Sequence, residues 1–157
     1  MAWARVPTPW GEFSAEADGQ RILALRFPGS APGRLGPHTP IHERLAHELG
    51  EYLTGRRRQF GVPFLTHGTP FQQAVWEELA AIPYGTTITY GELACRVGRP
   101  QAARAVGQAV GANPLPILIP CHRVLPAGGG CGGFGPGPSW KRRLLALEGV
   151  RGWAGGR

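Results

Sequence analysis

The sequence predicts an α+β protein with two lobes, and three patterns support that prediction. Residues 3–27 have a strand-like pattern with an Asp-Gly pair that is typical of a hairpin turn. Apolar residues then recur at helical spacing from Ile41. Two short helical segments joined by a tight glycine-containing turn, between residues 89 and 111, make a helix-turn-helix candidate. We expect lobes 1–66 and 67–157, the second mostly helical.

The N-terminal lobe should contain a small antiparallel sheet and one helix. Strands are expected at residues 12–16 and 21–27, on either side of the hairpin turn. The apolar residues that recur every four positions from Ile41 to Leu53 predict an amphipathic helix that can lie on the sheet. Residues 60–65 read as one more strand. This lobe carries no recognisable catalytic set, so we expect it to support the other lobe.

Capping signals place the helices of the C-terminal lobe. A helix is predicted over residues 70–82, because Thr69 suits the N-cap and a proline follows at the first helical position. Thr89 and Glu92 have the spacing of a capping box and begin the next helix. Two further helices are predicted over residues 101–111 and 139–148.

Composition and charge limit the classes of function. Net charge is +7 with a pI near 10.4, and nearly all the cations are arginines, whose guanidinium groups fork onto phosphate oxygens, so the charge favours a nucleic-acid partner. The alternative is that GC-rich coding simply replaces lysine with arginine. Lys141 is the only lysine, and we expect it to be solvated together with Arg142 and Arg143.

Other global features argue for a simple intracellular domain. Glycine and proline concentrate in residues 28–40 and 126–138, which predicts two long loops on a folded body. The three cysteines, Cys95, Cys121 and Cys131, form no CxxC pair, which argues against a disulfide framework or a four-cysteine zinc site and suits a reducing compartment. No membrane-length apolar run or secretory signal is evident, so we expect a cytoplasmic protein.

The helix over residues 101–111 is nearly bare of long side chains except for Arg104. A helix that reads the major groove displays Asn, Gln and Arg to base edges. A slim helix instead suits close approach to the minor groove without sequence reading, and with the net charge we favour that interpretation. The alternative is an interior helix packed through alanines. The small residues are Ala102, Ala103, Ala105, Gly107, Ala109 and Gly111.

The most informative stretch leads to Cys121. The apolar run of residues 117–119 ahead of Pro120 predicts a buried strand that ends at this cysteine, where a nucleophile could be held rigidly and still be reached. A buried, chemically inert cysteine is the alternative. His122 and Arg123 favour the nucleophile, because either could lower the pKa of the thiol.

Several motifs in one order resemble the O6-alkylguanine-DNA alkyltransferases, also called methylated-DNA–protein-cysteine methyltransferases. The resemblance is close from Thr69 to Gly149 and loose over the first sixty or so residues. It implies a winged-helix-like C-terminal lobe with an active-site cysteine. The motifs are Phe71-Gln72, Val75-Trp76, Ile82-Pro83-x-Gly85, Arg104-Ala105-Val106-Gly107, Asn113-Pro114, Pro120-Cys121-His122-Arg123-Val124 and Leu144-Leu145-Ala146-Leu147-Glu148-Gly149.

The resemblance implies single-turnover transfer of an alkyl group from O6 of guanine, possibly also O4 of thymine, to Cys121. His122 would take the thiol proton through water, Glu148 would orient His122, and Asn113 would brace the turn before the active cysteine. Tyr90 would drive base flipping and donate to the base, while Arg104 would fill the gap left in the stack. Further DNA contacts are expected at Ala102, Ala103, Gly107 and Arg123, and the guanine pocket at Val110, Val124 and Gly135.

Double-stranded DNA carrying alkylated guanine is therefore the expected partner of a monomeric protein that needs no metal and no cofactor. Phe134-Gly135-Pro136 departs from the Tyr-Ser-Gly run often found there in the family, which puts pocket size and substrate range in doubt. Two alternatives remain: a non-enzymatic sentinel that binds alkylated DNA and recruits excision repair, and a cysteine hydrolase that uses Cys121, His122 and Glu148. Cys121 disfavours the first, and the adjacency of Cys121 and His122 disfavours the second.

Overall fold

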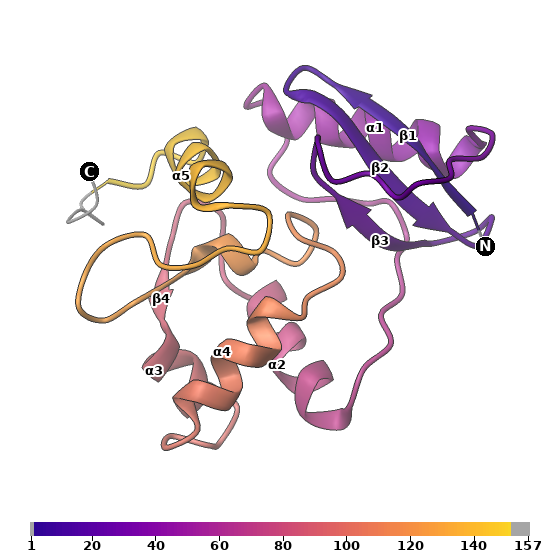
Figure 1. The fold of residues 1–157 in the computed structure, drawn as a ribbon. Helices are drawn as coiled ribbons and strands as arrows, with labels where there is room; N and C mark the ends of the chain where they lie inside the picture. The colour runs from indigo at the N-terminus through magenta and orange to yellow at the C-terminus, as the bar shows by residue number, and fades with distance from the viewer. Residues whose placement is uncertain (1, 152–157) are drawn as a thin grey trace. The chain divides into compact units, whose positions relative to one another are not determined.

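A computed structural model describes residues 2–151 (Figure 1). The chain forms two compact units, the first ending at Thr66 and the second beginning at His67. The first holds a three-stranded sheet and one helix, and the second holds four α-helices and a pair of two-residue strands, so the predicted α+β class is confirmed. No helix among the described residues is long and apolar enough to cross a membrane.

The first unit is an antiparallel meander covered by a helix. β1 (Ala2–Thr8), β2 (Gly11–Ala17) and β3 (Ile22–Arg26) pair in sequence order, and α1 (Pro40–Leu53) packs on them (Figure 1). The predicted hairpin and amphipathic helix are therefore both present. The buried His42 of α1 bonds to the Ala15 carbonyl at 3.1 Å, which ties the helix to the middle strand.

The strand predicted over residues 60–65 is reduced to a single bridge. Ile22 pairs with Phe64 in parallel, through bonds from the Ile22 amide to the Pro63 carbonyl at 2.9 Å and from the Leu65 amide to the Ile22 carbonyl at 3.0 Å. Pro63 has no amide to donate, so the ladder cannot continue through it. The buried Glu48 holds the preceding residues by accepting from the Gly61 and Val62 amides.

The second unit is a helical body in which the predicted capping signals are present. Thr69 and Thr89 each accept from the amide three residues on, while Gln72 and Glu92 reach back, so both helices begin with a capping box. Helix α4 packs against both α2 and α3. The elements are α2 (Pro70–Ala80), β4 (Ile88–Thr89), α3 (Tyr90–Arg96), α4 (Ala103–Gly111), β5 (Val124–Leu125) and α5 (Pro138–Leu147).

The strand predicted over residues 117–119 is absent, and a tight loop takes its place. Prolines at 114, 116 and 120 remove amide donors that a ladder would need. Asn113 organises the loop instead: its side-chain amide donates to the Ile119 carbonyl at 2.8 Å and its oxygen accepts from the Leu115 amide at 2.9 Å. Ile117 is buried with a φ of 77°, a left-handed conformation that is strained for a β-branched residue.

This loop makes Asn113 a stability determinant. We expect Asn113→Ala to lower the free energy of unfolding by about 1–3 kcal/mol, because two loop hydrogen bonds are lost and the Ile119 carbonyl loses its donor. Thermal denaturation checks the value, with Gln108→Ala on the exposed side of α4 as control. An unchanged melting temperature for Asn113→Ala would show that the brace is dispensable.

Candidate active site

Cys121 begins a single 3-10 turn, Cys121–Arg123, that follows directly from the Asn113-braced loop. Its amide donates to the Ile119 carbonyl at 2.7 Å, and the turn leads straight into β5. The cysteine is 6% exposed, so its sulfur sits at the edge of the core rather than on the surface. A tight turn thus replaces the predicted strand end as the support for this side chain.

The environment of Cys121 favours the neutral thiol. Burial raises its pKa to about 11, while a hydrogen bond with Asn113 and the positive charge of Lys141 act in the opposite direction. The expectation that His122 and Arg123 lower the thiol pKa is therefore wrong. Both side chains are turned to another partner.

That partner is Glu148, the residue that caps the C-terminus of α5. His122 Nε2 lies 2.8 Å from a Glu148 carboxylate oxygen, and both side chains are 0% exposed. A carboxylate can only accept, so Nε2 carries the proton and Nδ1 is the basic nitrogen of the neutral ring. Burial lowers the pKa of His122 despite the carboxylate beside it. His122 is thus a neutral base at physiological pH.

Arg123 completes the arrangement around the carboxylate. Its Nε and Nη2 donate to the two Glu148 oxygens at 2.8 Å each, and Nη1 donates to the Ile82 carbonyl at 2.7 Å. Gly85 adds a backbone bond to the same carboxylate at 3.1 Å. Arg123 is 6% exposed, and a DNA phosphate could reach it only by breaking this pair. We therefore revise its expected role from DNA contact to support of Glu148.

Lys141 differs most from the sequence-based expectation. The structure places it in the core at 0% exposure, not in solvent, with Nζ donating to the carbonyls of Val124 at 2.8 Å and Gly133 at 3.3 Å. Helical spacing carried the signal that was missed: Lys141 lies three and four residues before the buried Leu144 and Leu145, on the inner face of α5.

Helix α4 presents Arg104 and the alanines of its first turn to solvent, while Ala109 is buried. Ala103 and Arg104 are exposed and Ala102 is half-buried, whereas Val110 is in the core. Gly107 lies against Tyr90, since a Cβ at this position would be 3.9 Å from the phenol ring. Burial raises the pKa of Tyr90, and the nearby Cys121 and Cys131 act in the same direction. Tyr90 therefore joins α4 to the surroundings of the cysteine.

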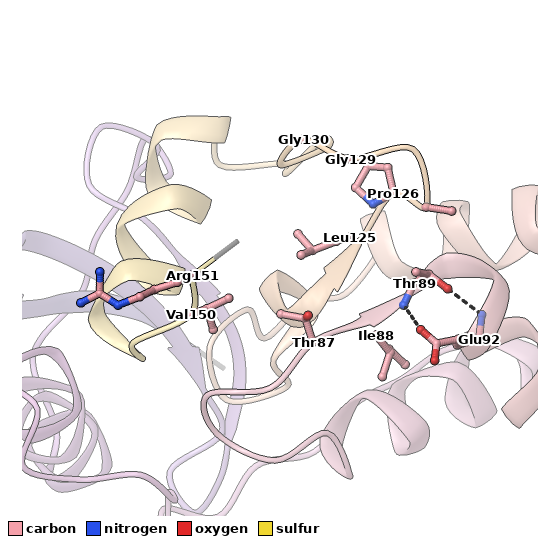
Figure 2. Close-up of a pocket in the computed structure, with 11 residues that line it drawn as sticks. Thr87, Ile88, Thr89, Glu92, Leu125, Pro126, Gly129, Gly130, Val150 and Arg151 are labelled. Carbon is pink, nitrogen blue, oxygen red and sulfur yellow. Dashed lines mark hydrogen bonds between the residues drawn. The ribbon is translucent and has the colours of Figure 1, made fainter. Parts of the chain in front are cut away.

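A hollow of about 290 Å³ lies beside β4 and β5 (Figure 2). The glycine-rich loop borders it at Gly129 and Gly130, while Val124, Gly135 and Cys121 do not line it. The hollow is therefore distinct from the predicted contacts of the guanine base. Its lining residues are Thr87, Ile88, Thr89, Glu92, Leu125, Pro126, Ala127, Gly129, Gly130, Val150 and Arg151.

Comparison with known proteins decides the family. The family model described as 6-O-methylguanine DNA methyltransferase, DNA binding domain, matches residues 70–150. The chain belongs to this family. It is 40% identical over 148 residues to the methylated-DNA–protein-cysteine methyltransferase of Haemophilus influenzae, an alignment that covers 90% of this chain and 83% of the relative.

The mycobacterial members of the family give a further match. The chain is 50% identical over 101 residues to the Mycobacterium tuberculosis methylated-DNA–protein-cysteine methyltransferase, which covers 64% of this chain and 61% of that relative's length. The crystal structure of M. tuberculosis OGT in complex with DNA superimposes with a TM-score of 0.86 at 38% identity, covering 94% of this chain and 92% of the other. The family fold therefore extends through both units.

The buried imidazole makes stability depend on pH. The pKa of His122 is lower in the folded protein than its ordinary value of 6.5, so the unfolded chain binds the additional proton and stability falls as pH drops through 6.5. We expect the melting temperature to fall less between pH 7.5 and pH 5.5 for His122→Gln than for the wild type. Gln108→Ala, an exposed substitution without a titrating group, should keep the wild-type slope, and equal slopes in all three would contradict the assignment.

The Arg123 fork should control both stability and the charge of His122. Arg123→Met leaves a buried carboxylate without its cation, so we expect a loss of about 3–5 kcal/mol in the free energy of unfolding. Removing the guanidinium also removes a charge that lowers the pKa of His122, so imidazole resonances followed by NMR should titrate at higher pH. Arg123→Lys keeps the charge but loses the two parallel hydrogen bonds. Its stability and its His122 pKa should therefore lie between those of the wild type and of Arg123→Met. An unshifted His122 titration in Arg123→Met would refute the coupling.

Proposed function

We propose that this protein repairs DNA by transferring a methyl or larger alkyl group from O6 of guanine to the sulfur of Cys121. The observation that carries the proposal is the buried His122–Glu148 pair, which begins at the residue directly after the cysteine. The names of its relatives support it, since they are methylated-DNA–protein-cysteine methyltransferases. The neutral His122 supplies the base that a neutral thiol requires.

The transfer balances with the groups present. The Cys121 thiol gives its proton through water to Nδ1 of His122, and Glu148 stabilises the imidazolium that forms. The thiolate attacks the alkyl carbon in line, so a carbon–sulfur bond forms as the carbon–O6 bond breaks. Tyr90 donates a hydrogen bond to the base as negative charge develops on the leaving guanine. The guanine takes up one proton and the His122 imidazolium releases one, so the thiol proton ends on the base. The product is unmodified guanine and a thioether at Cys121.

DNA binding is assigned to the exposed side of α4. Arg104 is exposed and, within residues 2–151, makes no hydrogen bond or ion pair, so its guanidinium is available to enter the base stack. Ala102, Ala103 and Gly107 keep the helix slim enough for a close approach without base reading. An O6-alkyl group lies inside the duplex, so the nucleotide must leave the stack before the sulfur can reach it.

The flipped guanine would be recognised mainly by backbone groups. The carbonyls of Cys121 and Val124 accept from its amino group, the Gly135 amide faces O6, and Val110 contributes apolar surface. Val124 already accepts from Lys141, but a carbonyl oxygen has two lone pairs and can take a second donor. The Phe134-Gly135-Pro136 segment lacks the family's usual hydroxyl, so O6 recognition rests on the backbone amide.

Each molecule acts once. A thioether is unreactive at neutral pH, and among residues 2–151 the other thiol near the site, that of Cys131, does not displace an alkyl group from it. The three cysteines are free thiols, which suits a monomeric protein at work in the reducing cytoplasm.

Incubation with duplex DNA that carries radiolabelled O6-methylguanine tests the proposal. We expect label on the wild-type protein to reach and not exceed one methyl per molecule, with none on Cys121→Ala. His122→Gln should slow transfer by about 10²–10⁴-fold at unchanged DNA affinity, because the base is lost while α4 is untouched.

The other outcomes separate the alternatives. Tight binding of methylated DNA without label on the wild type would favour a sentinel protein. Neither binding nor label would leave a cysteine hydrolase as the interpretation. More than one methyl removed per molecule would overturn the single-turnover mechanism.

A further inference from the structure

The only lysine of the chain is buried among backbone carbonyls. Lys141 is 0% exposed, and its Nζ is held by two backbone carbonyls, those of Val124 and Gly133. Within residues 2–151, no carboxylate forms an ion pair with this ammonium. Burial of a charge that is met only by dipoles is costly, so the position of Lys141 requires a compensating interaction.

The two carbonyls belong to the segments assigned to the guanine base. Val124 begins β5, and Gly133 lies two residues before Gly135 in the glycine-rich loop. The loop backbone passes close to the ammonium, since a Cβ at Gly132 would lie 3.6 Å from Nζ. Lys141 thus ties α5 to both segments at one point.

The charges around Cys121 leave one cation uncompensated. Arg123 and Glu148 neutralise each other, and His122 is neutral at physiological pH. Tyr90 from α3 is uncharged, since its pKa is raised, and Cys131 of the loop is a second thiol that lies near Lys141 as Cys121 does. The charge of Lys141 lowers the pKa of Cys121 against the effect of burial, and burial in turn lowers the pKa of Lys141.

We propose that Lys141 is a positioning residue for the alkyl transfer: its ammonium is the internal counter-charge of the Cys121 thiolate and fixes the Val124 carbonyl and the glycine-rich loop around the base. The second role rests on the proposed function, whereas the first can be measured without DNA. No carboxylate of residues 2–151 pairs with the ammonium, and the Cys121 thiolate supplies an anionic partner when it forms. The uncompensated charge of the resting site therefore stabilises the reactive state.

Alkylation of the free protein with iodoacetamide at pH 8, followed residue by residue by peptide mass spectrometry, tests the counter-charge. Lys141→Gln keeps donors for the two carbonyls and removes the charge. We expect it to slow alkylation of Cys121 at least tenfold, which corresponds to about one pKa unit. The exposed Cys95 is an internal reference that should react equally in all variants.

Two further variants control the experiment. Arg142→Gln removes the same charge from the exposed neighbour on α5 and should leave the Cys121 rate unchanged. Lys141→Arg restores the charge and should recover most of the rate. A folded Lys141→Gln protein that reacts at the wild-type rate would overturn the proposal. If Lys141→Gln does not fold, the test passes to Lys141→Arg. A folded Lys141→Arg protein whose Cys121 is alkylated at least tenfold more slowly than in the wild type would overturn the proposal.

Transfer from methylated DNA completes the test. Lys141→Gln should lose at least tenfold in the rate of methyl transfer and bind DNA as the wild type does, because α4 is untouched. Unimpaired transfer by this variant would refute the positioning role. A different outcome would be that Cys121 depends on Lys141 for its reaction with iodoacetamide while the wild-type protein takes no methyl group from DNA. That outcome would refute the proposed function, and the counter-charge role of Lys141 would stand.

Discussion

The candidate site depends on the carboxylate of Glu148, which is buried and accepts hydrogen bonds from Arg123, His122 and Gly85. Two come from the Arg123 fork, one from His122 and one from the Gly85 amide. A buried carboxylate without these donors would be expensive to maintain, so it fixes the positions of all the groups that serve it. The end of α5, the turn before β4 and the turn that holds Cys121 are thereby joined at one residue.

The 3-10 geometry of the cysteine turn explains how three adjacent residues perform separate tasks. With three residues per turn, successive side chains point about 120° apart. Cys121 can therefore face the edge of the core while His122 and Arg123 reach Glu148. Arg123 pairs with the carboxylate and leaves His122 as a neutral donor to it. Adjacency in sequence, which argues against a hydrolase triad, is what this turn requires.

Local signals in the sequence were sufficient for the helices and the hairpin. Thr69 and Thr89 specify their helix starts through contacts within three residues, so both capping boxes could be predicted without knowledge of the fold. The apolar run at residues 117–119 could not be assigned in this way. Its burial was evident, but a strand also needs a partner and amide donors, and three nearby prolines with Asn113 produce a loop instead.

In the candidate site, too, some residues could be identified from the sequence, and the placement of others depends on tertiary contacts. The resemblance supplied Cys121, His122 and Glu148, and the structure brings His122 and Glu148 together at 2.8 Å beside the cysteine turn. The placement of Arg123 and Lys141 depends on tertiary contacts, since a cation in a basic chain is usually solvated. Only the positions of Glu148 and of the Val124 and Gly133 carbonyls show that these two cations are structural.

Burial of the thiol places a further requirement on the site. A pKa raised to about 11 keeps Cys121 neutral at physiological pH, which protects the sulfur from reagents that attack thiolates. The same burial opposes the transfer, because the nucleophile is the thiolate. Solvent cannot stabilise that anion in a closed site, so the stabilising charges must already be inside the protein. In the transfer that we propose, His122 accepts the proton and Lys141 remains as the cation, so protection of the sulfur and its activation on DNA would use the same buried environment.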